Sequence, residues 1–194
     1  MEGHKEDRRI RRTKKLLKQA LAQLMDEKEF KDITVKDITE RADLNRGTFY
    51  LHYTDTYDIL NKIENEILFN LQSMVDEKTN SADLPEDLAR CTLMPIAEYI
   101  KENSDIFRCL INNKVSADFI EKLRDFIFNN CSEIIKRRYS IKENRINDYY
   151  FSFITYGIIG VIKEWLEKKP LLDVCEIVGF ADKVINSSIE AIKD

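Results

Sequence analysis

The pattern of hydrophobic and polar positions predicts a protein built from helices. Apolar residues recur every three or four positions along most of the 194 residues, whereas the strict alternation typical of half-buried strands is almost absent. With only five glycines and three prolines, the chain has few turn signals. The predicted fold class is therefore all-α, and the length suits one compact unit or two small ones.

The N-terminal part of the chain is predicted to hold three helices, two of them short. An apolar stripe at helical spacing places the first helix at about 9–26. Thr34 and Asp37 have the spacing of a capping box, which starts the second helix, and Asn45 caps the third. Two short capped helices joined by a tight turn are typical of a helix-turn-helix.

A longer fourth helix is expected next, capped by Thr54 or Asp55, and polar residues 76–83 resemble a linker. Pro95 lies inside an otherwise helical pattern and is expected to kink or break it. The remaining helices are predicted at about 85–102, 104–112, 116–138, 144–168 and 173–192.

The net charge changes sign at the boundary between the three predicted N-terminal helices and the longer fourth helix. The net charge is −4, but residues 1–53 are net positive and residues 54–194 are net negative, and eight basic residues lie between Lys5 and Lys18. A basic region joined to an acidic body indicates a nucleic-acid partner, although a solvated helix face explains the charge equally well. We predict a helix-turn-helix domain over 1–53 and a helical body over 54–194, with the fourth helix as connector.

Several classes of protein are disfavoured by what the sequence lacks. The longest mostly apolar stretch, 151–162, is shorter than the roughly 18 residues of a membrane span. The charged N-terminus has no apolar signal core, so we expect a cytoplasmic protein without a membrane partner. Phosphate-binding loops, zinc-protease motifs and serine-hydrolase motifs are absent. We therefore expect no enzyme activity, no metal and no cofactor.

The four cysteines have no metal-ligand spacing. In a protein without an export signal they are expected to be reduced and buried as small apolar residues. A redox-sensing role stays open as the alternative, because Cys109 follows the basic residue Arg108.

The predicted third helix divides its residues between two faces. Phe49 and Tyr53, four positions apart, are expected to point into the core. Arg46 and Tyr50 share another face, where Gly47 presents no side chain and would let the wall of a DNA groove approach closely. Arginine can bond guanine bidentately. A purely structural role explains the two inward aromatics but not the other face, which we predict to contact DNA.

Phosphate contacts are expected beside this face. Backbone N–H groups at the start of the helix, near Gly47 and Thr48, would favour an anion. His52 lies just before the fourth helix, where a phosphate contact is favoured over a buried structural role.

The segment ITVKDITERADLNRGTFYLHYTDTYDIL, with the basic helix before it, resembles the TetR family of transcription regulators. The shared pattern is a threonine cap, a short helix, a turn, and Gly-Thr-aromatic-Tyr-x-His-aromatic before a long helix. The resemblance covers about residues 9–60. It implies base contacts from Asn45, Arg46, Gly47 and Tyr50, and phosphate contacts from Thr34, Thr48, Tyr50 and His52.

One position departs from the family pattern. The family usually has a lysine at the start of the fourth helix, and Thr54-Asp55-Thr56 supplies none. The resemblance implies a ligand-responsive repressor that binds a palindromic operator on double-stranded DNA as a homodimer, with a small-molecule effector of unknown identity. The missing lysine and the acidic body leave an alternative open, namely an adaptor or co-activator of the same fold that acts through a protein partner.

The body is predicted to supply the dimer surface and the effector pocket. Residues 146–166 are apolar on nearly every side, so their helix needs a second buried face, which a partner subunit would cover. The alternative is that this helix is the centre of a monomer. The predicted dimer surface comprises Tyr149, Phe153, Gly157, Gly160, Val161, Val178 and Ile185. The predicted pocket lining comprises Met94, Tyr99, Phe107, Phe126, Tyr150 and Tyr156, although aromatic residues at helical spacing more often form core.

Overall fold

The computed structural model describes residues 8–80, 87–112, 117–142, 144–169 and 171–192, and its regular elements in these ranges are all helical. The predicted all-α fold class is therefore confirmed. The elements are α1 (Arg8–Glu27), η1 (Phe30–Asp32), α2 (Val35–Arg41), α3 (Arg46–Tyr50), α4 (Thr56–Thr79), α5 (Leu88–Glu102), α6 (Ser104–Asn112), α7 (Ala117–Tyr139), α8 (Arg145–Glu167), α9 (Val174–Ser188) and η3 (Ile189–Ile192).

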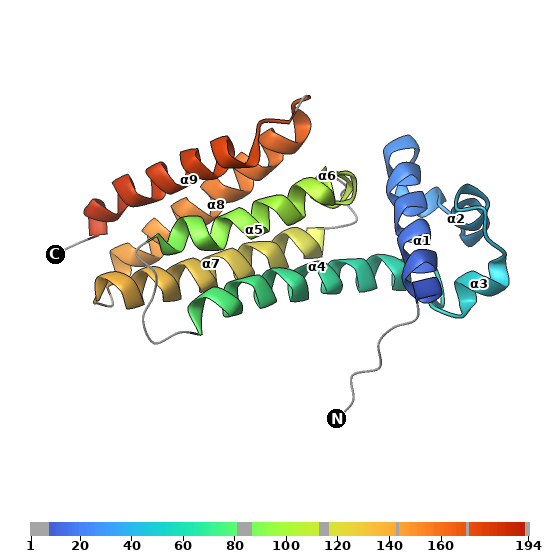
Figure 1. Cartoon of the computed structure of the whole chain (residues 1–194), viewed down its shortest axis with the longest axis horizontal. Coiled ribbons are helices and arrows are strands. Elements are labelled where there is room, and N and C mark those ends of the chain that lie inside the picture. The colour runs from blue at the N-terminus through green and yellow to red at the C-terminus, as the bar shows by residue number, and fades with distance from the viewer. Residues whose placement is uncertain (1–7, 81–86, 113–116, 143, 170, 193–194) are drawn as a thin grey trace.

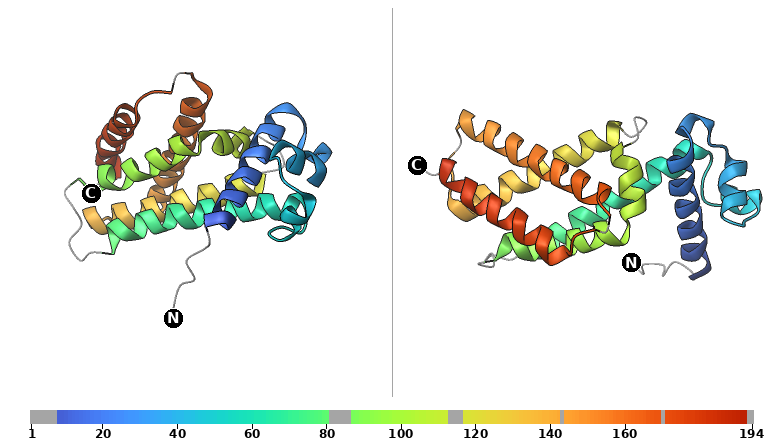
Figure 2. Two further views of the ribbon diagram at one scale, coloured as in Figure 1. Left: turned by 45° about the vertical axis from the view of Figure 1, so that its right-hand side comes forward. Right: turned by 90° about the horizontal axis from the view of Figure 1, so that it is seen from above.

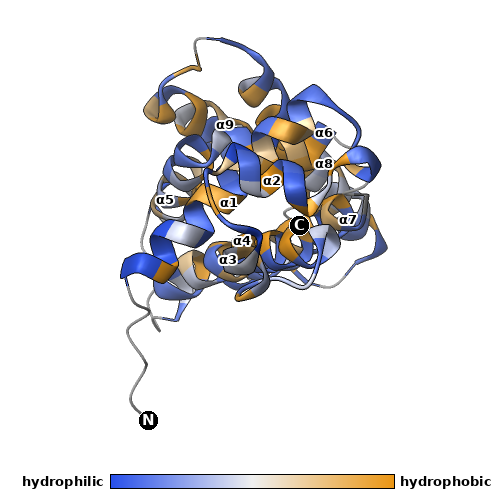
Figure 3. Ribbon diagram, turned by 90° about the vertical axis from the view of Figure 1, so that its right-hand side faces the viewer, coloured by the Kyte–Doolittle hydropathy of each residue, from blue (hydrophilic) through white to orange (hydrophobic). Residues whose placement is uncertain are grey.

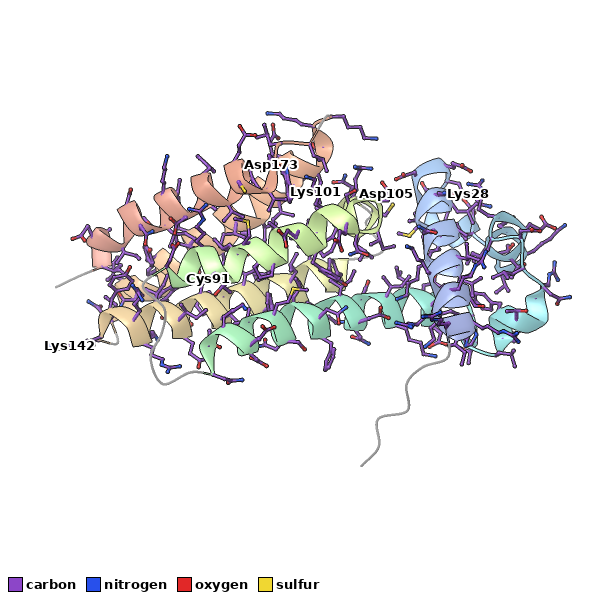
Figure 4. All side chains as sticks on the ribbon, in the orientation of Figure 1. Lys28, Cys91, Lys101, Asp105, Lys142 and Asp173 are labelled. Carbon is purple, nitrogen blue, oxygen red and sulfur yellow. The ribbon has the colours of Figure 1, made fainter. Side chains whose placement is uncertain are left out.

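The helices form a small head and an elongated body. The head contains α1 to α3 and lies at one end of the molecule, while α4 starts at the head and runs along the body (Figure 1). Helices α8 and α9 lie on the opposite side of the body from α4 (Figures 1 and 2). The N-cap of α9, Asp173, faces Lys101 of α5 with 4.0 Å between the carboxylate and the ammonium (Figure 4).

Most predicted helix boundaries agree with the structure, and two expectations do not. The expected linker at 76–83 is wrong for its first part, because α4 continues to Thr79 and Asn80 forms its C-cap. Pro95 does not break α5, which extends from Leu88 to Glu102. Proline removes one helical hydrogen bond, but the turn beyond it buries Ala97 and Ile100 in the core, which stabilises the continued helix.

The head is held together by caps and by ion pairs between α1 and α2. Thr34 and Asp37 form the predicted capping box, in which the Asp37 carboxylate accepts from the Thr34 N–H at 2.9 Å. The same carboxylate accepts from the Lys28 ammonium at 2.8 Å (Lys28 is labelled in Figure 4). Arg41 donates to both oxygens of Glu27. These bonds fix α2 at the C-terminal end of α1 and so orient the short helix that follows.

The turn between α2 and α3 depends on one left-handed residue. Asp43 has a φ of 52°, a conformation that few residue types other than glycine, asparagine and aspartate adopt readily. Leu44 then donates its N–H to the Thr39 carbonyl at 2.9 Å, which closes the turn. Thr39 itself is buried, and its hydroxyl donates to the Val35 carbonyl at 2.9 Å, so the polar group has a partner in the core.

Helix α4 is fixed to the head along its first two turns. The Tyr57 ring meets Phe30 edge-on with 5.0 Å between the ring centroids. The Lys62 ammonium donates to the His52 carbonyl at 3.0 Å and lies 5.4 Å from the centroid of the Tyr53 ring. The start of α4 therefore moves with the end of α3.

Further along, α4 also contacts the body, while Glu66 still pairs with Lys18 of α1. The buried carboxylate of Glu64 lies 3.5 Å from the Lys122 ammonium of α7, and burial raises the pKa of this carboxyl although the lysine opposes the shift. Asn70 donates to the Tyr99 hydroxyl of α5 at 3.0 Å. One hydrophobic core runs through the head and this part of the body.

The cysteines are only partly as expected. Cys109 is buried where α6 packs against α1, and its thiol donates to the Ala22 carbonyl at 3.2 Å. Burial raises the pKa of the Cys109 thiol to about 12, which keeps it protonated and argues against a redox role. Cys91 (Figure 4) and Cys175 are exposed, so the expectation of burial is wrong for these two.

The capping box gives the head a specific pH dependence. The Lys28 ammonium and the bonds from Thr34 hold the pKa of Asp37 well below its ordinary value of 3.8. Because the folded-state pKa is depressed, this contribution to the free energy of unfolding is present above about pH 4 and is lost as the pH falls further. We expect Asp37→Asn to lower the free energy of unfolding by about 0.5–2 kcal/mol at neutral pH, the usual cost of a lost cap.

Urea denaturation at a series of pH values measures this effect. The difference between wild type and Asp37→Asn should narrow as the pH falls below 3.8. Asp32→Asn changes another exposed carboxylate of the head that lies outside the capping box, and it serves as the control. A difference that stays constant with pH would contradict the role given to Asp37.

Candidate functional site

The short helix α3 presents the two predicted faces. Phe49 and Tyr53 are buried, with 0% and 3% of their surfaces exposed. Tyr50 is 58% exposed, and Arg46 and Gly47 are exposed beside it. The predicted division into an inward and an outward face is therefore confirmed, while contact of the outward face with DNA stays a prediction.

The start of α3 differs from the expectation of an anion-binding helix end. Asn45 caps the helix, and its side-chain oxygen accepts from the Gly47 N–H at 2.8 Å. The Thr48 N–H donates to the Asn45 carbonyl at 2.9 Å. These two amides are thus engaged inside the turn, so a phosphate would have to be bound by other groups.

Gly47 is not required by the conformation of the chain. Its φ is not positive, and a Cβ atom placed on it would approach the Asn45 side-chain oxygen to 3.4 Å, which is ordinary van der Waals contact. Because the fold itself has room for a side chain here, the missing side chain matters only for what approaches from outside. This observation supports a surface that another molecule contacts closely.

The charge beside this face is available for binding. Within the described residues the Arg46 guanidinium makes no ion pair, whereas Lys28 and Arg41 are both paired with carboxylates. The basic N-terminal half of α1 lies on the same side of the head as α3 (Figures 1 and 3), and its exposed cations include Arg8, Arg11, Arg12 and Lys15.

The three residues predicted to contact only phosphates differ in availability. The Thr34 hydroxyl is engaged in the capping box, where it donates to Asp37 at 2.8 Å. Thr48 and His52 are each partly exposed. Thr34 is thus exposed but already bonded, whereas the side chains of Thr48 and His52 make no hydrogen bond to any described residue.

Lys62 was missed by the sequence reasoning. It lies on the second turn of α4, and its ammonium sits 3.0 Å from the His52 carbonyl and 2.9 Å from an Asp58 carboxylate oxygen. A cation is therefore present near the start of α4, although Thr54-Asp55-Thr56 provides none. The sequence does contain a signal for Lys62, because Asp58 and Lys62 are four positions apart and this spacing pairs side chains on one helix face.

An apolar cavity of about 110 Å³ lies in the body between α4, α5, α7 and α8. Of the six predicted lining residues, only Phe107 and Phe126 reach it. Most of the other lining side chains are leucine and isoleucine from five helices, which helical spacing alone could not distinguish from ordinary core.

The four remaining aromatic or methionine positions have other surroundings. Met94 packs against the main core, and the Tyr99 hydroxyl is bonded to Asn70. The Tyr150 hydroxyl lies 3.0 Å from the Ser188 hydroxyl, and Tyr156 is exposed. None of these four lines the cavity, so their expected place in a pocket is not supported by the structure.

A second hollow, an apolar groove of about 190 Å³, lies between α5, α8 and α9. Of the predicted dimer surface, Tyr149, Phe153, Gly157 and Gly160 are exposed and Val161 is partly exposed. Val178 and Ile185 instead face the core of their own chain. A partner chain would meet the exposed side chains of α9, Phe180 and Val184, in their place.

The cavity and the groove share a wall. Its side chains contribute to the lining of both hollows, and they come from α5, α8 and α9. They are Leu93, Ile96, Ile100, Ile158, Ile162 and Ile185.

The described part of the chain shows neither a metal site nor a membrane-spanning helix. No cluster of three or more His, Cys, Asp or Glu side chains there could hold a metal ion. None of the described helices is both long and apolar enough to cross a lipid bilayer.

Two family models match the chain. Residues 17–63 match bacterial regulatory proteins of the tetR family, and residues 90–187 match a transcriptional regulator C-terminal region. The chain is also 27% identical over 97 residues to the HTH-type transcriptional regulator YxbF of Bacillus subtilis (strain 168). That match covers 50% of this chain and 26% of YxbF, so the chain spans about a quarter of the length of this curated relative.

Solved structures share the fold at low sequence identity. The fatty acid degradation regulator FadR of Bacillus halodurans is 14% identical with a TM-score of 0.70, and the match covers 93% of this chain and 96% of that one. A TetR transcriptional regulator of Streptococcus agalactiae 2603V is 21% identical with a TM-score of 0.58, covering 93% and 97%. Thermus thermophilus FadR, solved with lauroyl-CoA, is 16% identical with a TM-score of 0.57, covering 89% and 93%.

Gly47→Ala should affect the thermal stability of the protein and its affinity for DNA in different ways. Alanine favours a helix over glycine by roughly 0.5–1 kcal/mol, so the thermal stability should be unchanged or higher. If a DNA groove packs against this position, the added methyl group should weaken binding by about 1–3 kcal/mol, as overpacking does. Thermal melting and a gel shift with DNA from upstream of the gene measure the two effects.

Gly179→Ala makes the same change on α9, where a Cβ would meet no atom within 4 Å, and serves as the control. A Gly47→Ala protein that binds DNA as tightly as wild type would show that nothing approaches this glycine closely.

Proposed function

The chain belongs to the TetR family of bacterial transcriptional regulators, and we propose that it is a ligand-responsive repressor that binds a palindromic operator as a homodimer. The observation that carries this proposal is the outward face of α3, where Arg46, Gly47 and Tyr50 are exposed. Membership of a family of transcription factors agrees with the expectation that the protein is not an enzyme. Since its target is the bacterial chromosome, it would act in the cytoplasm.

In this proposal the head, residues 1–53, contacts the operator. Arg46 and Tyr50 reach base edges in the major groove, with Asn45 beside them, and Gly47 lets the groove wall approach. Thr48 and His52 contact phosphates. The cations of α1 add a sequence-independent attraction for the DNA backbone.

The exposed apolar surface of α8 and α9 supports the homodimer. Phe153 is 68% exposed and Tyr149 and Phe180 are also exposed, which is unusual for large apolar side chains unless another molecule covers them. A Cβ placed on Gly157 or Gly160 would meet no atom within 4 Å, so a partner helix could approach closely there. In a two-fold dimer the two recognition helices would read half-sites about one helical turn apart, roughly 34–36 Å.

The cavity of the body, residues 54–194, supports an effector. A ligand there would press on α4, which is fixed to the head through Tyr57 and Lys62, and on the wall shared with the proposed dimer groove. Either displacement changes the spacing of the two heads. Thermus thermophilus FadR was solved with lauroyl-CoA, but the likeness to that protein is one of fold alone and does not identify the ligand of this chain.

An adaptor or co-activator that acts through a protein partner is the alternative. The absence of a lysine at residues 54–56 and the acidic body favour it. The two functions differ in whether the isolated protein binds DNA at all. Measuring the affinity of the wild type for DNA upstream of its gene decides between them.

Removal of Arg46 tests the proposed operator contact. Affinity of the wild type for DNA upstream of its gene should fall steeply with salt, with the logarithm of affinity linear in the logarithm of salt concentration. Arg46→Ala should weaken specific binding by about 1–3 kcal/mol and relax the sequence preference. Arg124→Ala removes the same charge from α7 in the body and should leave the affinity unchanged. No DNA binding by the wild type would favour the adaptor, and equal binding by Arg46→Ala would refute the assigned face.

A bulky side chain at Gly157 tests the proposed dimer. The chain has space around this position, so Gly157→Leu should fold normally while its side chain obstructs the partner helix. Overpacking by about 1–3 kcal/mol would raise the dimer dissociation constant about 5- to 150-fold. Analytical ultracentrifugation measures this change, and operator binding should fall with it. Asn129→Leu adds a similar side chain to the exposed surface of α7 and serves as the control. A wild type that is monomeric at all concentrations would contradict the dimer.

A further inference from the structure

The cavity contains one hydroxyl group without a hydrogen-bonding partner. Thr92 of α5 lines the cavity, is only 6% exposed, and its Oγ1 makes no hydrogen bond to any described residue. Buried hydroxyl groups are nearly always bonded, because an unpaired one has lost its water without a replacement. A ligand that completed this bond would remove that penalty.

The remaining polar groups of the cavity are already satisfied or uncharged. The Asn130 amide donates to the Phe126 carbonyl at 2.8 Å and exchanges bonds with the Gln72 amide. Burial raises the pKa of the Cys131 thiol to about 12, so it stays neutral. None of the described residues that line the cavity is acidic or basic. A charged ligand group would therefore lose its hydration here without gaining a partner.

Size and shape limit the ligand further. The cavity of about 110 Å³ is comparable to an engineered cavity of about 150 Å³ that binds benzene. Thr92 lies in the first half of α5, which is the half farther from the head (Figure 1), whereas Phe107 comes from α6, which packs against α1. A ligand bonded to Thr92 would thus direct its apolar end toward α6 and the head.

We propose that the cavity binds a small uncharged molecule, an apolar ring or short chain that carries one hydroxyl or carbonyl group, and that the Thr92 hydroxyl bonds this group. The proposal rests on the ligand response proposed above and names its chemical class. Thr92 sets both the choice of ligand and its orientation, because its hydroxyl is the one buried side-chain oxygen or nitrogen among the described lining residues that lacks a partner.

Phenol, benzene and benzoate are suitable probes, since they share a ring and differ in one group. Titration calorimetry with the full chain should show phenol binding about 5- to 10-fold more tightly than benzene, the usual net effect of one hydrogen bond. Benzoate should not bind. Thr92→Val, which keeps the shape and removes the hydroxyl, should lose the preference for phenol over benzene, because the phenol hydroxyl then has no partner in the cavity. The ligand-free Thr92→Val protein should also melt at a higher temperature, because the unpaired hydroxyl is gone.

Thr155→Val is the matched control. Thr155 is the other buried threonine whose hydroxyl lacks a partner among the described residues, but it does not line the cavity. Its valine variant should also melt at a higher temperature yet keep the preference for phenol. Loss of the preference in both variants, or in neither, would overturn the role of Thr92.

Two further results would overturn the proposed ligand class. One is benzoate binding as tightly as phenol, and the other is binding of none of the probes to the folded protein. Failure of the proposed repressor function would appear separately, as a lack of operator binding in the gel shift with wild type, and would leave these titrations unchanged.

Discussion

The rest of the structure depends on one face of α4, which is buried from Ile59 to Val75 while the elements that cover it change from the head to the body. Its stripe from Ile59 to Leu71 lies in one continuous core, whose first part belongs to the head and whose second part belongs to the body. Polar contacts follow the same division, with Lys62 bonded to the head and Asn70 to the body. Because apolar surface would be exposed if either half slipped along α4, a tilt of this helix in the body is carried to α3.

The parts of the fold that could be predicted are those set by residues close together in sequence. The capping box of Thr34 and Asp37 and the Asn45 cap are local bonds, so their spacing was enough to place α2 and α3. The two faces of α3 follow from helical geometry, and burial of Phe49 and Tyr53 agrees with it. The tight turn between the two helices was predicted as well, but the left-handed backbone of Asp43 was not foreseen, because aspartate adopts this conformation only in some turns.

The parts that could not be predicted depend on which helices meet. Periodicity marks a face of α9 as apolar, but it does not say that Val178 is covered by the chain's own α5 and α8 while Phe180 remains exposed. Cavity lining has the same difficulty, since isoleucines beside an empty volume have the same spacing as isoleucines in a filled core. The bond of Lys62 to the His52 carbonyl and the burial of Glu64 beside Lys122 were not foreseen, because each partner lies outside α4.

The wall shared by the cavity and the groove has a consequence for how such a regulator would be tuned in a cell. The same six side chains line both hollows, so a ligand in the cavity and a partner chain in the groove would be thermodynamically linked. The number of gene copies would then affect the response, because a higher concentration of the chain would change the ligand concentration at which half of the protein has bound ligand. A change in the volume of any of these six side chains would likewise alter ligand preference and self-association together.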